Sequence, residues 1–305
     1  MVLLDVEKAY DSVWQEAILH KMLLGNFPSY ILKLIRSFLV NRSYHVAVNG
    51  HTSDRYEVPF GVPQGAVLSP TLYNIFTADM VMLDDVQYYL FADDTGFIAA
   101  DSDPVIVVDK LQAAQNAIEN YQRKWKIKTN ANKSQAIFFT RKRSPQKLPQ
   151  QAISIWGQHI PWSDDVGYLG LTLDRRLTFA THVNKVLGKC DKLTRMLYPL
   201  INRRSHLDKN SKLLLYKLVF MPSMTYGFPA WFDCAATHRK KLQTKQNRLL
   251  KMMLNLDPFH PTEDLHRLAK VELIDEWIQR VLPKFWLGCA TSANPLLEQL
   301  TARRL

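Results

Sequence analysis

The sequence has few cysteines and no long apolar runs. Its three cysteines, Cys190, Cys234 and Cys289, lie far apart. Their spacing fits neither a disulfide framework nor a set of metal ligands, which excludes a small secreted scaffold and a zinc module. The nine histidines show no ligand spacing either. No apolar run is long enough to cross a bilayer, and no charged-then-apolar leader is present, so we expect an intracellular protein that does not associate with membranes.

The chain of 305 residues is basic, but its charge is unevenly distributed. Residues 1–174 carry 16 Lys+Arg and 18 Asp+Glu, whereas residues 175–305 carry 23 and 10. The hydrophobic fraction of 47% is sufficient for a packed core. The charge distribution therefore indicates a catalytic front joined to a rear that holds a polyanion, although a basic solvated surface gives the same counts.

The apolar patterns predict a mixed front and a helical rear. The predicted helices are Ser12–Leu24, Tyr30–Val40, Ser69–Leu83 and Val108–Trp125. The predicted strands and hairpins are Met1–Val6, a hairpin turning at Asn49-Gly50, a hairpin around Asp93-Asp94, Gln135–Thr140, Ile153–Ile160 and Tyr168–Leu173, with Arg141–Gln151 as a loop. From Phe179 onward the pattern remains helical. The fold class is therefore α+β for residues 1–174, followed by an all-helical region at 175–305.

Two adjacent carboxylates interrupt an apolar strand pattern at Asp93-Asp94. Like charges this close repel, and a divalent cation with oxygen ligands is the usual remedy. Many such pairs are solvated turns, as we expect for Asp84-Asp85 and Asp164-Asp165. The pair predicts a metal site only if other groups join it.

Other groups that suit such a site lie earlier in the chain. Asp5 closes the first predicted strand, and Tyr10 follows it closely. Transfer of a nucleotidyl group by two metal ions about 3.5–4 Å apart needs carboxylates from at least two segments and a surface that positions the nucleotide. The glycine-bearing loop at Gln64-Gly65 allows a close backbone approach of the kind such a surface needs.

Five ordered motifs resemble those of reverse transcriptases encoded by non-LTR (LINE-type, jockey-like) retrotransposons. The motifs are Leu3–Trp14, Gly61–Pro70, Phe91–Thr95, Asn130–Ser134 and Tyr168–Asp174. The similarity continues around Tyr226-Gly227 and Gln243–Asn247 on the thumb side. It implies a polymerase palm, an antiparallel sheet with packed helices, at 1–174 and a helical thumb and C-terminal region at 175–305.

The resemblance also implies roles for single residues. Asp5, Asp93 and Asp94 would bind two Mg²⁺ ions, with Mn²⁺ possible, and Lys133 would protonate the leaving pyrophosphate. Tyr10 would exclude a ribose 2′-hydroxyl, and Gln64 and Gly65 would contact the incoming nucleotide. The competing interpretations are a core aromatic for Tyr10, a tight turn for Gln64-Gly65 and a surface lysine for Lys133.

Two further sets of residues would hold nucleic acid. The resemblance assigns Tyr168, Leu169 and Gly170 to the hairpin that grips the primer. Independently, Lys241, Lys245, Arg248 and Lys251 follow helical spacing, so they form a stripe that could track a phosphate backbone. A solvated charged face is equally compatible with that stripe.

The expected function is RNA-directed DNA polymerase activity with an RNA template, a DNA primer and deoxynucleoside triphosphates. The element RNA would be bound in a ribonucleoprotein in the cytoplasm and the nucleus. Only four residues precede Asp5, so we expect an N-terminally truncated fragment that lacks the fingers. The alternatives are a catalytically inactive remnant that only binds nucleic acid and, with less support, another phosphoryl-transfer enzyme such as a nuclease.

Overall fold

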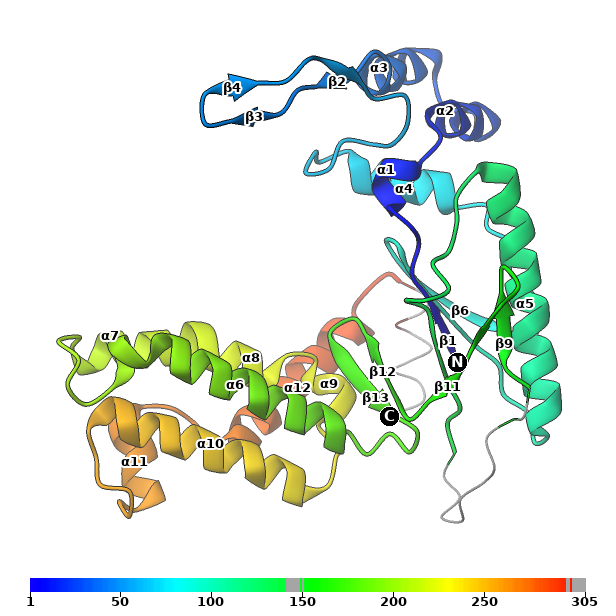
Figure 1. Cartoon of the computed structure of the whole chain (residues 1–305). Helices are drawn as coiled ribbons and strands as arrows, with labels where there is room; N and C mark the ends of the chain where they lie inside the picture. The colour runs from blue at the N-terminus through cyan, green and yellow to red at the C-terminus, as the bar shows by residue number, and fades with distance from the viewer. Residues whose placement is uncertain (141–148, 150, 295–296, 298–305) are drawn as a thin grey trace. The chain divides into compact units, whose positions relative to one another are not determined.

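The computed structural model describes residues 1–140, 149, 151–294 and 297 (Figure 1). The loop predicted at 141–151 lies almost entirely outside these residues. The chain divides into two compact units, unit 1 at Met1–Val166 and unit 2 at Gly167–Leu305. No helix among the described residues is long and apolar enough to cross a bilayer.

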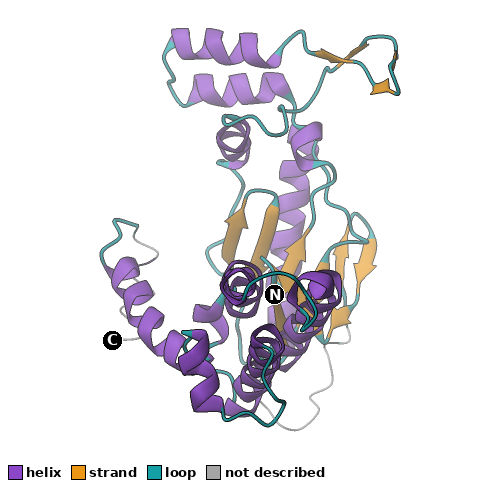
Figure 2. Cartoon of the chain, turned by 90° about the vertical axis from the view of Figure 1, so that its left-hand side faces the viewer, coloured by secondary structure: helices purple, strands orange, loops and turns teal. Residues whose placement is uncertain are grey.

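Unit 1 is organised around a five-stranded sheet in the order β11-β8-β1-β7-β6. Figure 2 draws the strands of the chain in orange and its helices in purple. Its strands are β1 (Val2–Leu4), β6 (Gln87–Phe91), β7 (Asp94–Ile98), β8 (Gln135–Ile137) and β11 (Trp162–Ser163). Strand β1 pairs antiparallel with both β7 and β8, and all three of its residues are buried. A strand buried on both faces has the continuously apolar sequence seen here.

Helix α5 (Pro104–Trp125) supplies one wall of the sheet's core. Buried residues of α5, including Leu111 and Ile118, join Val2, Leu4 and Phe97 of the sheet in one apolar cluster. The helix begins four residues before the predicted start at Val108. It does so because Asp103 caps it, accepting a hydrogen bond from the Val105 N–H, and Pro104 occupies the first turn.

Four helices at one end of unit 1 form a second core. They are α1 (Ala9–Ser12), α2 (Gln15–Leu24), α3 (Ser29–Leu39) and α4 (Ser69–Thr77). The predicted single helix at Ser12–Leu24 is wrong at its start, because α1 and α2 are separate helices. Lys8 precedes α1 with φ +47° and turns the chain out of β1. This left-handed conformation is unusual for a residue with a side chain, so pattern alone did not reveal the turn.

Lys21 ties three helices of this end together. Its ammonium donates to the carbonyl of Phe76, in α4, and to the carboxylate of Asp79, just after α4. It also donates to the hydroxyl of Tyr121 on α5, at a distance of 2.7 Å. It also lies 3.9 Å from the centre of the Trp125 ring. Burial lowers the pKa of Lys21, partly offset by Asp79. The side chain is a buried cation whose donors are satisfied, which is the condition for tolerating its burial.

Two short hairpins extend from α3. Strands β2 (Ser43–Tyr44) and β5 (Tyr56–Glu57) pair with each other, as do β3 (Ala47–Val48) and β4 (His51–Thr52). Asn49 and Gly50 both have positive φ, +50° and +80°. This is the two-residue turn that their sequence predicts, and the hairpin is confirmed.

Two further hairpins complete the strands. Strands β9 (Ile153–Ile155) and β10 (Gln158–Ile160) form the predicted hairpin. The single strand that the apolar pattern predicts at Tyr168–Leu173 is wrong, because β12 (Asp165–Tyr168) and β13 (Leu171–Asp174) form a hairpin, as the family resemblance implied. Leu169 and Gly170 have φ +46° and +78°, which is the backbone of a tight hairpin turn.

Unit 2 is mostly helical, as predicted for the rear of the chain. Its helices are α6 (Ala180–Ile201), α7 (Lys209–Leu215), a π-helical turn (Tyr216–Phe220), α8 (Met221–Thr225), α9 (Phe228–Trp231), α10 (Ala236–Leu254), α11 (Thr262–Ala269) and α12 (Ile274–Ala290). One apolar cluster, which includes Tyr216, Phe220, Trp231 and Leu250, joins them. The unit therefore has its own core.

The stability of unit 2 is expected to depend on pH through His182. Its Nδ1 accepts a hydrogen bond from the Thr172 N–H (3.3 Å), and its Nε2 is buried and has no hydrogen-bond partner among the described residues. Burial, and to a lesser extent the charge of Lys185, lowers the pKa of His182. The folded state thus binds this proton less well than the unfolded state does. The free energy of unfolding of unit 2 should therefore be highest above the pKa of His182 in the unfolded chain, about 6.5, and should fall as the pH drops below that value.

Thermal unfolding between pH 8 and pH 5 measures this dependence. Replacing His182 by Gln should make the melting temperature of unit 2 less dependent on pH. Replacing the exposed His206 by Gln should leave the pH dependence of that melting temperature unchanged. Equal pH dependence in the two variants would rule out His182 as the cause.

Candidate active site

Two acidic segments meet at one edge of the unit 1 sheet. Asp5 directly follows β1, and Asp93 and Asp94 lie at the connection of β6 to β7. The pairing of Val2 with Phe97 and of Leu4 with Thr95 continues, one step further, to place Asp5 across from Asp94. The sheet therefore brings carboxylates from distant parts of the sequence together, as the sequence predicted.

The turn that presents Asp93 is strained. Phe91 pairs with Asp94, so Ala92 and Asp93 form a two-residue connection. Ala92 has φ +52°, a conformation that residues with a Cβ adopt at some cost. Such strain persists where the surrounding structure imposes it, and it is concentrated at functional sites.

The backbone of Asp5 is held by the segment before β8. The Asp5 N–H donates to Ser134 Oγ (3.3 Å), and the Asp5 carbonyl accepts from the Asn130 N–H (2.7 Å). This places Lys133 Nζ 3.7 Å from Asp5 Oδ2. Both side chains are largely exposed, so the pair contributes little stability. Its relevance is the position of a cation beside the carboxylate.

The electrostatics of the edge favour a bound cation. Partial burial and the carboxylates of Asp93 and Asp5 raise the pKa of Asp94. Within the described residues, no three His, Cys, Asp or Glu side chains are arranged as a ready-made metal-binding group. The donors nevertheless suit Mg²⁺, because carboxylate oxygens are its preferred protein ligands and a cation would relieve the repulsion that the raised pKa reflects.

The loop before α4 is fixed against α1 by a glycine. Gly61 has φ +81°, and a Cβ there would lie 2.8 Å from the Cα and the carbonyl oxygen of Asp11. Backbone bonds run from the Gly61 N–H to Val13 O (2.7 Å) and from the Val62 N–H to Tyr10 O (2.8 Å). Only a residue without a side chain allows this approach.

The same loop is closed on its other side by two side chains. Gln64 Nε2 donates to Asp11 Oδ1 (2.9 Å), and Ser69 Oγ donates to Pro63 O (2.5 Å). Helix α4 begins at Ser69, as predicted, but the Ser69 hydroxyl binds the loop, and α4 has no side-chain cap. Gly65, with φ +84°, has open space where a Cβ would be. The loop thus presents Gln64 and Gly65 on its surface.

Tyr10 is held in place by an aromatic neighbour. Its ring stacks on that of Tyr73, with centroids 5.0 Å apart and an angle of 22° between the planes. Tyr73 is buried, and burial with the charge of Asp93 raises the pKa of its hydroxyl. Tyr10 is only half-buried. It therefore combines a fixed ring with an accessible edge.

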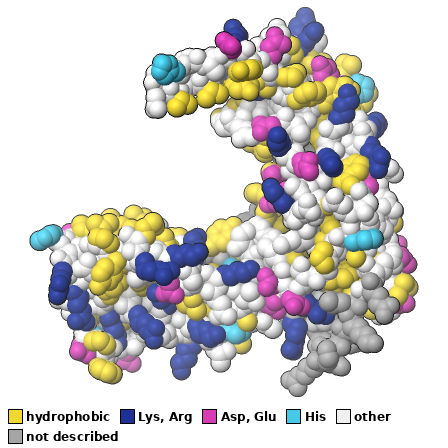
Figure 3. All heavy atoms as spheres, viewed as in Figure 1, with side chains coloured by type: hydrophobic (Ala, Val, Ile, Leu, Met, Phe, Trp, Pro, Cys, Tyr) yellow, Lys and Arg dark blue, Asp and Glu magenta, His cyan; other side chains and the backbone are white. Residues whose placement is uncertain are grey.

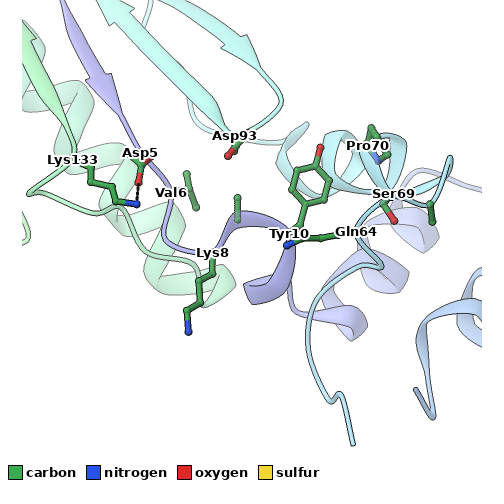
Figure 4. A pocket seen from close by; sticks show the side chains of 12 residues that line it. Asp5, Val6, Lys8, Tyr10, Gln64, Ser69, Pro70, Asp93 and Lys133 are labelled. Carbon is green, nitrogen blue, oxygen red and sulfur yellow. Dashed lines mark ion pairs between the residues drawn. The ribbon is translucent and has the colours of Figure 1, made fainter. Parts of the chain in front are cut away.

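These groups surround one cavity of about 630 Å³ (Figure 4). Its lining residues are Asp5, Val6, Lys8, Ala9, Tyr10, Gln64, Gly65, Ala66, Ser69, Pro70, Asp93 and Lys133. Six of the residues predicted from the sequence lie here together. Asp94, the seventh in unit 1, is on the adjoining strand and does not line the cavity.

Lys8 is a lining residue to which the sequence assigned no role. It is exposed, and in Figure 4 its side chain extends away from Asp93. Lys8 lies between Asp5 and Tyr10 in the first motif, and this position could have predicted that it lines the cavity.

The remaining predicted residues lie in unit 2. Tyr168, Leu169 and Gly170 form the β12–β13 turn, where the Tyr226 hydroxyl donates to Leu169 O (3.0 Å). A Cβ at Gly170 would lie 2.8 Å from the Tyr226 ring. The turn is thus packed closely against Tyr226.

The four basic residues of α10 differ in availability. Lys241 and Arg248 are exposed. Lys245 pairs with Asp191 Oδ1 of α6 (2.6 Å), and Lys251 donates to Pro258 O (2.6 Å). Half of the predicted stripe is therefore engaged in contacts within unit 2.

Comparison with known proteins agrees with the motifs. Residues 1–173 match the family model described as reverse transcriptase (RNA-dependent DNA polymerase). The RNA-directed DNA polymerase from mobile element jockey of Drosophila melanogaster is 30% identical, over 97% of this chain and 33% of that protein. The probable RNA-directed DNA polymerase from transposon X-element of the same fly is 29% identical, over 99% and 33%.

A solved structure also aligns with the chain. Telomerase from Candida albicans, in complex with a fragment of telomeric RNA, aligns with 90% of this chain and 51% of its own at a TM-score of 0.47 and 11% identity. The chain spans about a third of the length of the two curated fly polymerases. The resemblance inferred from the five motifs is confirmed by the family model, which covers more than half of the chain. The chain therefore belongs to the reverse transcriptase (RNA-dependent DNA polymerase) family, with the polymerases of jockey-like non-LTR elements among its relatives.

Proposed function

We propose that the chain carries the catalytic centre of an RNA-directed DNA polymerase, which extends a DNA primer on an RNA template by two-metal nucleotidyl transfer. The observation that carries the proposal is the shared cavity in unit 1. It combines Asp5 and Asp93 from two strands with the fixed ring of Tyr10 and the loop of Gln64 and Gly65. A nuclease would need the carboxylates but not the nucleotide-facing loop.

Asp5, Asp93 and Asp94 are the residues that would hold two Mg²⁺ ions, or Mn²⁺ in their place, with the Val6 carbonyl as a further oxygen ligand. When bound, the ions supply activation of the primer 3′-hydroxyl and stabilisation of charge on the phosphates. The strained Ala92 turn keeps Asp93 directed into the cavity that it lines. Asp94 completes the donor set from the adjoining strand.

The other lining residues position the nucleotide. Gln64 and Gly65 provide an amide and an unobstructed backbone for contact with it. Tyr10, braced by Tyr73, provides a rigid surface against the sugar and excludes a 2′-hydroxyl. Lys133, 3.7 Å from Asp5, is placed to donate a proton to the leaving pyrophosphate.

The wider assignment follows from the same proposal. Residues 1–174 would be the palm, and residues 175–305 the thumb and C-terminal region. The turn of Tyr168, Leu169 and Gly170 would grip the primer. The protein would act with the element RNA in a cytoplasmic and nuclear ribonucleoprotein.

Primer extension with a labelled DNA primer on an RNA template tests the proposal. The full chain with Mg²⁺ and deoxynucleoside triphosphates should lengthen the primer, and EDTA should stop it. Binding of the RNA–DNA hybrid without any extension would instead identify an inactive remnant that only binds nucleic acid.

Replacing Tyr10 by Val tests the proposed sugar selection. Removal of the ring opens the cavity beside the sugar, so incorporation of ribonucleotides relative to deoxynucleotides should rise by roughly a hundredfold, since a removed steric clash is worth about 3 kcal/mol. The ratio of kcat/KM for the two nucleotide classes measures this. A Tyr73→Phe variant keeps the stack and should leave the ratio unchanged. An unchanged ratio in Tyr10→Val would leave Tyr10 as a core aromatic only.

A further inference from the structure

A second cavity, of about 520 Å³, lies entirely within unit 2. It is lined by Arg203, Thr244, Asn247, Arg248, Lys251, Met252, Leu256 and Pro258. These residues come from the connection of α6 to α7, from the second half of α10 and from the segment that follows it. Figure 3 shows the many Lys and Arg side chains on the surface of unit 2.

The cavity is positively charged, and two of its three cations are anchored. Arg203 donates to Leu256 O (2.6 Å) and Lys251 to Pro258 O (2.6 Å), so both are held by the same short segment. Among the described residues that line the cavity, none is acidic. The Arg248 side chain is exposed and makes no ion pair or hydrogen bond with any described residue. The N–H donors of the Arg248 guanidinium are therefore available to an anion, and the fixed charges of Arg203 and Lys251 would attract that anion.

The polar wall beside Arg248 is also preorganised. Asn247 Oδ1 accepts from Gln243 Nε2 (2.7 Å) and lies 2.9 Å from His266 Nε2. The orientation of Gln243 is set in turn, because its Oε1 accepts from the Ile274 N–H (2.8 Å). The Asn247 amide nitrogen then retains donor capacity, since its contact with Thr262 Oγ1 is long (3.4 Å).

The opposite wall of the cavity is apolar. This indicates a ligand that has a carbon-rich part in addition to a phosphate group. Met252, Leu256 and Pro258 form it. Arginine, lysine and asparagine are the donors that proteins use for phosphate oxygens, and an apolar wall suits the carbon face of a sugar. Free phosphate would use the donors and leave the apolar wall without a contact.

We propose that this cavity binds the phosphodiester backbone of a nucleic acid strand, with the strand's phosphate on Arg248 and its sugar against Met252 and Leu256. The choice of nucleic acid as the ligand rests on the proposed polymerase function. The site adds Arg203 to the residues expected from the sequence. Of the predicted basic stripe, only Arg248 and Lys251 line the cavity. Lys241 lies outside it, and Lys245 is paired with Asp191.

Two variants of the full chain test the site. Arg248→Gln removes the free cation in the cavity, and Lys241→Gln removes an exposed cation from the same helix outside it. Fluorescence anisotropy with a labelled single-stranded RNA in EDTA measures binding without metal-dependent chemistry. Arg248→Gln should weaken binding roughly tenfold and lower the salt slope by about 0.7, the value for one phosphate contact on a single strand. Lys241→Gln should change the affinity less than about twofold.

Three outcomes would overturn the site. Equal losses in both variants would indicate a diffuse basic surface, and no loss in Arg248→Gln would remove Arg248 from the interface. Binding of inorganic phosphate that depends on Arg248, without an effect of Arg248 on RNA, would assign the cavity to free phosphate. The extension assay separates this site from the proposed function. Arg248-dependent RNA binding in a chain without extension would leave the cavity assigned and refute only the polymerase.

Discussion

Replacing Asp93 by Asn is expected to lower the rate of primer extension by about three orders of magnitude. Asp93 lies in the β6–β7 turn and lines the cavity of unit 1 together with Asp5. The amide keeps the shape of the side chain but removes the charge that would hold a cation. Losing a charged ligand is worth several kcal/mol of transition-state stabilisation, and about 1.4 kcal/mol changes a rate tenfold.

A second acidic pair in the same unit provides the control. Asp84 and Asp85 are also adjacent and exposed, but they lie outside the cavity. Asp85→Asn changes the net charge by the same amount and should extend primers at the wild-type rate. Single-turnover extension at saturating nucleotide compares the variants directly. Similar activity in Asp93→Asn and wild type would exclude Asp93 as a metal ligand.

Replacing Gly61 by Ala is expected to destabilise unit 1 by about 3 kcal/mol, which lowers its melting temperature by roughly 10 °C. The added Cβ would lie 2.8 Å from the Cα and carbonyl oxygen of Asp11. Both are backbone atoms, so no side chain can rotate to relieve the contact. The loop must move away from α1, and Gln64 and Gly65 move with it. Nucleotide affinity should therefore fall together with stability.

A Gly50→Ala variant distinguishes the steric cost of an added Cβ from the cost of the left-handed backbone conformation. Its φ of +80° matches the +81° of Gly61, but nothing lies within 4 Å of an added Cβ. Gly50→Ala should cost only the left-handed backbone penalty of about 1 kcal/mol. Thermal unfolding of the two variants gives the difference. If both lost the same stability, the close approach of the loop to α1 would have no energetic importance.

The sequence predicted the features of this fold that depend on neighbouring residues. Asn49-Gly50 specifies a hairpin turn because both residues tolerate positive φ, and the alternation around Asp93 specifies a strand, a turn and a strand. The position of Asp5 at one edge of the sheet followed from the same local pattern, because Asp5 comes directly after a strand that is apolar throughout. The family resemblance added the order of the motifs.

Features that depend on distant contacts were not predicted. Ser69 has the sequence context of a helix cap, but its hydroxyl binds Pro63 O within a loop that packs on α1. Lys245 belongs to an apparent basic stripe, but Asp191, 54 residues earlier, neutralises it. The apolar pattern alone did not reveal the turn at Leu169-Gly170, because leucine rarely adopts the positive φ that it has here. In each case a tertiary partner outweighs the local preference.

The central position of β1 also determines when the sheet edge that carries Asp5 and Asp93 can form during synthesis. Strand β1 pairs with β7, more than 90 residues later, and with β8, about 130 residues later. Asp5 and Asp93 therefore remain apart until the ribosome has released β7, and the segment that fixes Asp5 arrives only with Asn130 and Ser134. Pairings of such long sequence separation close slowly. The apolar strand β1 therefore stays without its partner strands throughout that interval, and unpaired apolar strands are prone to misassociation.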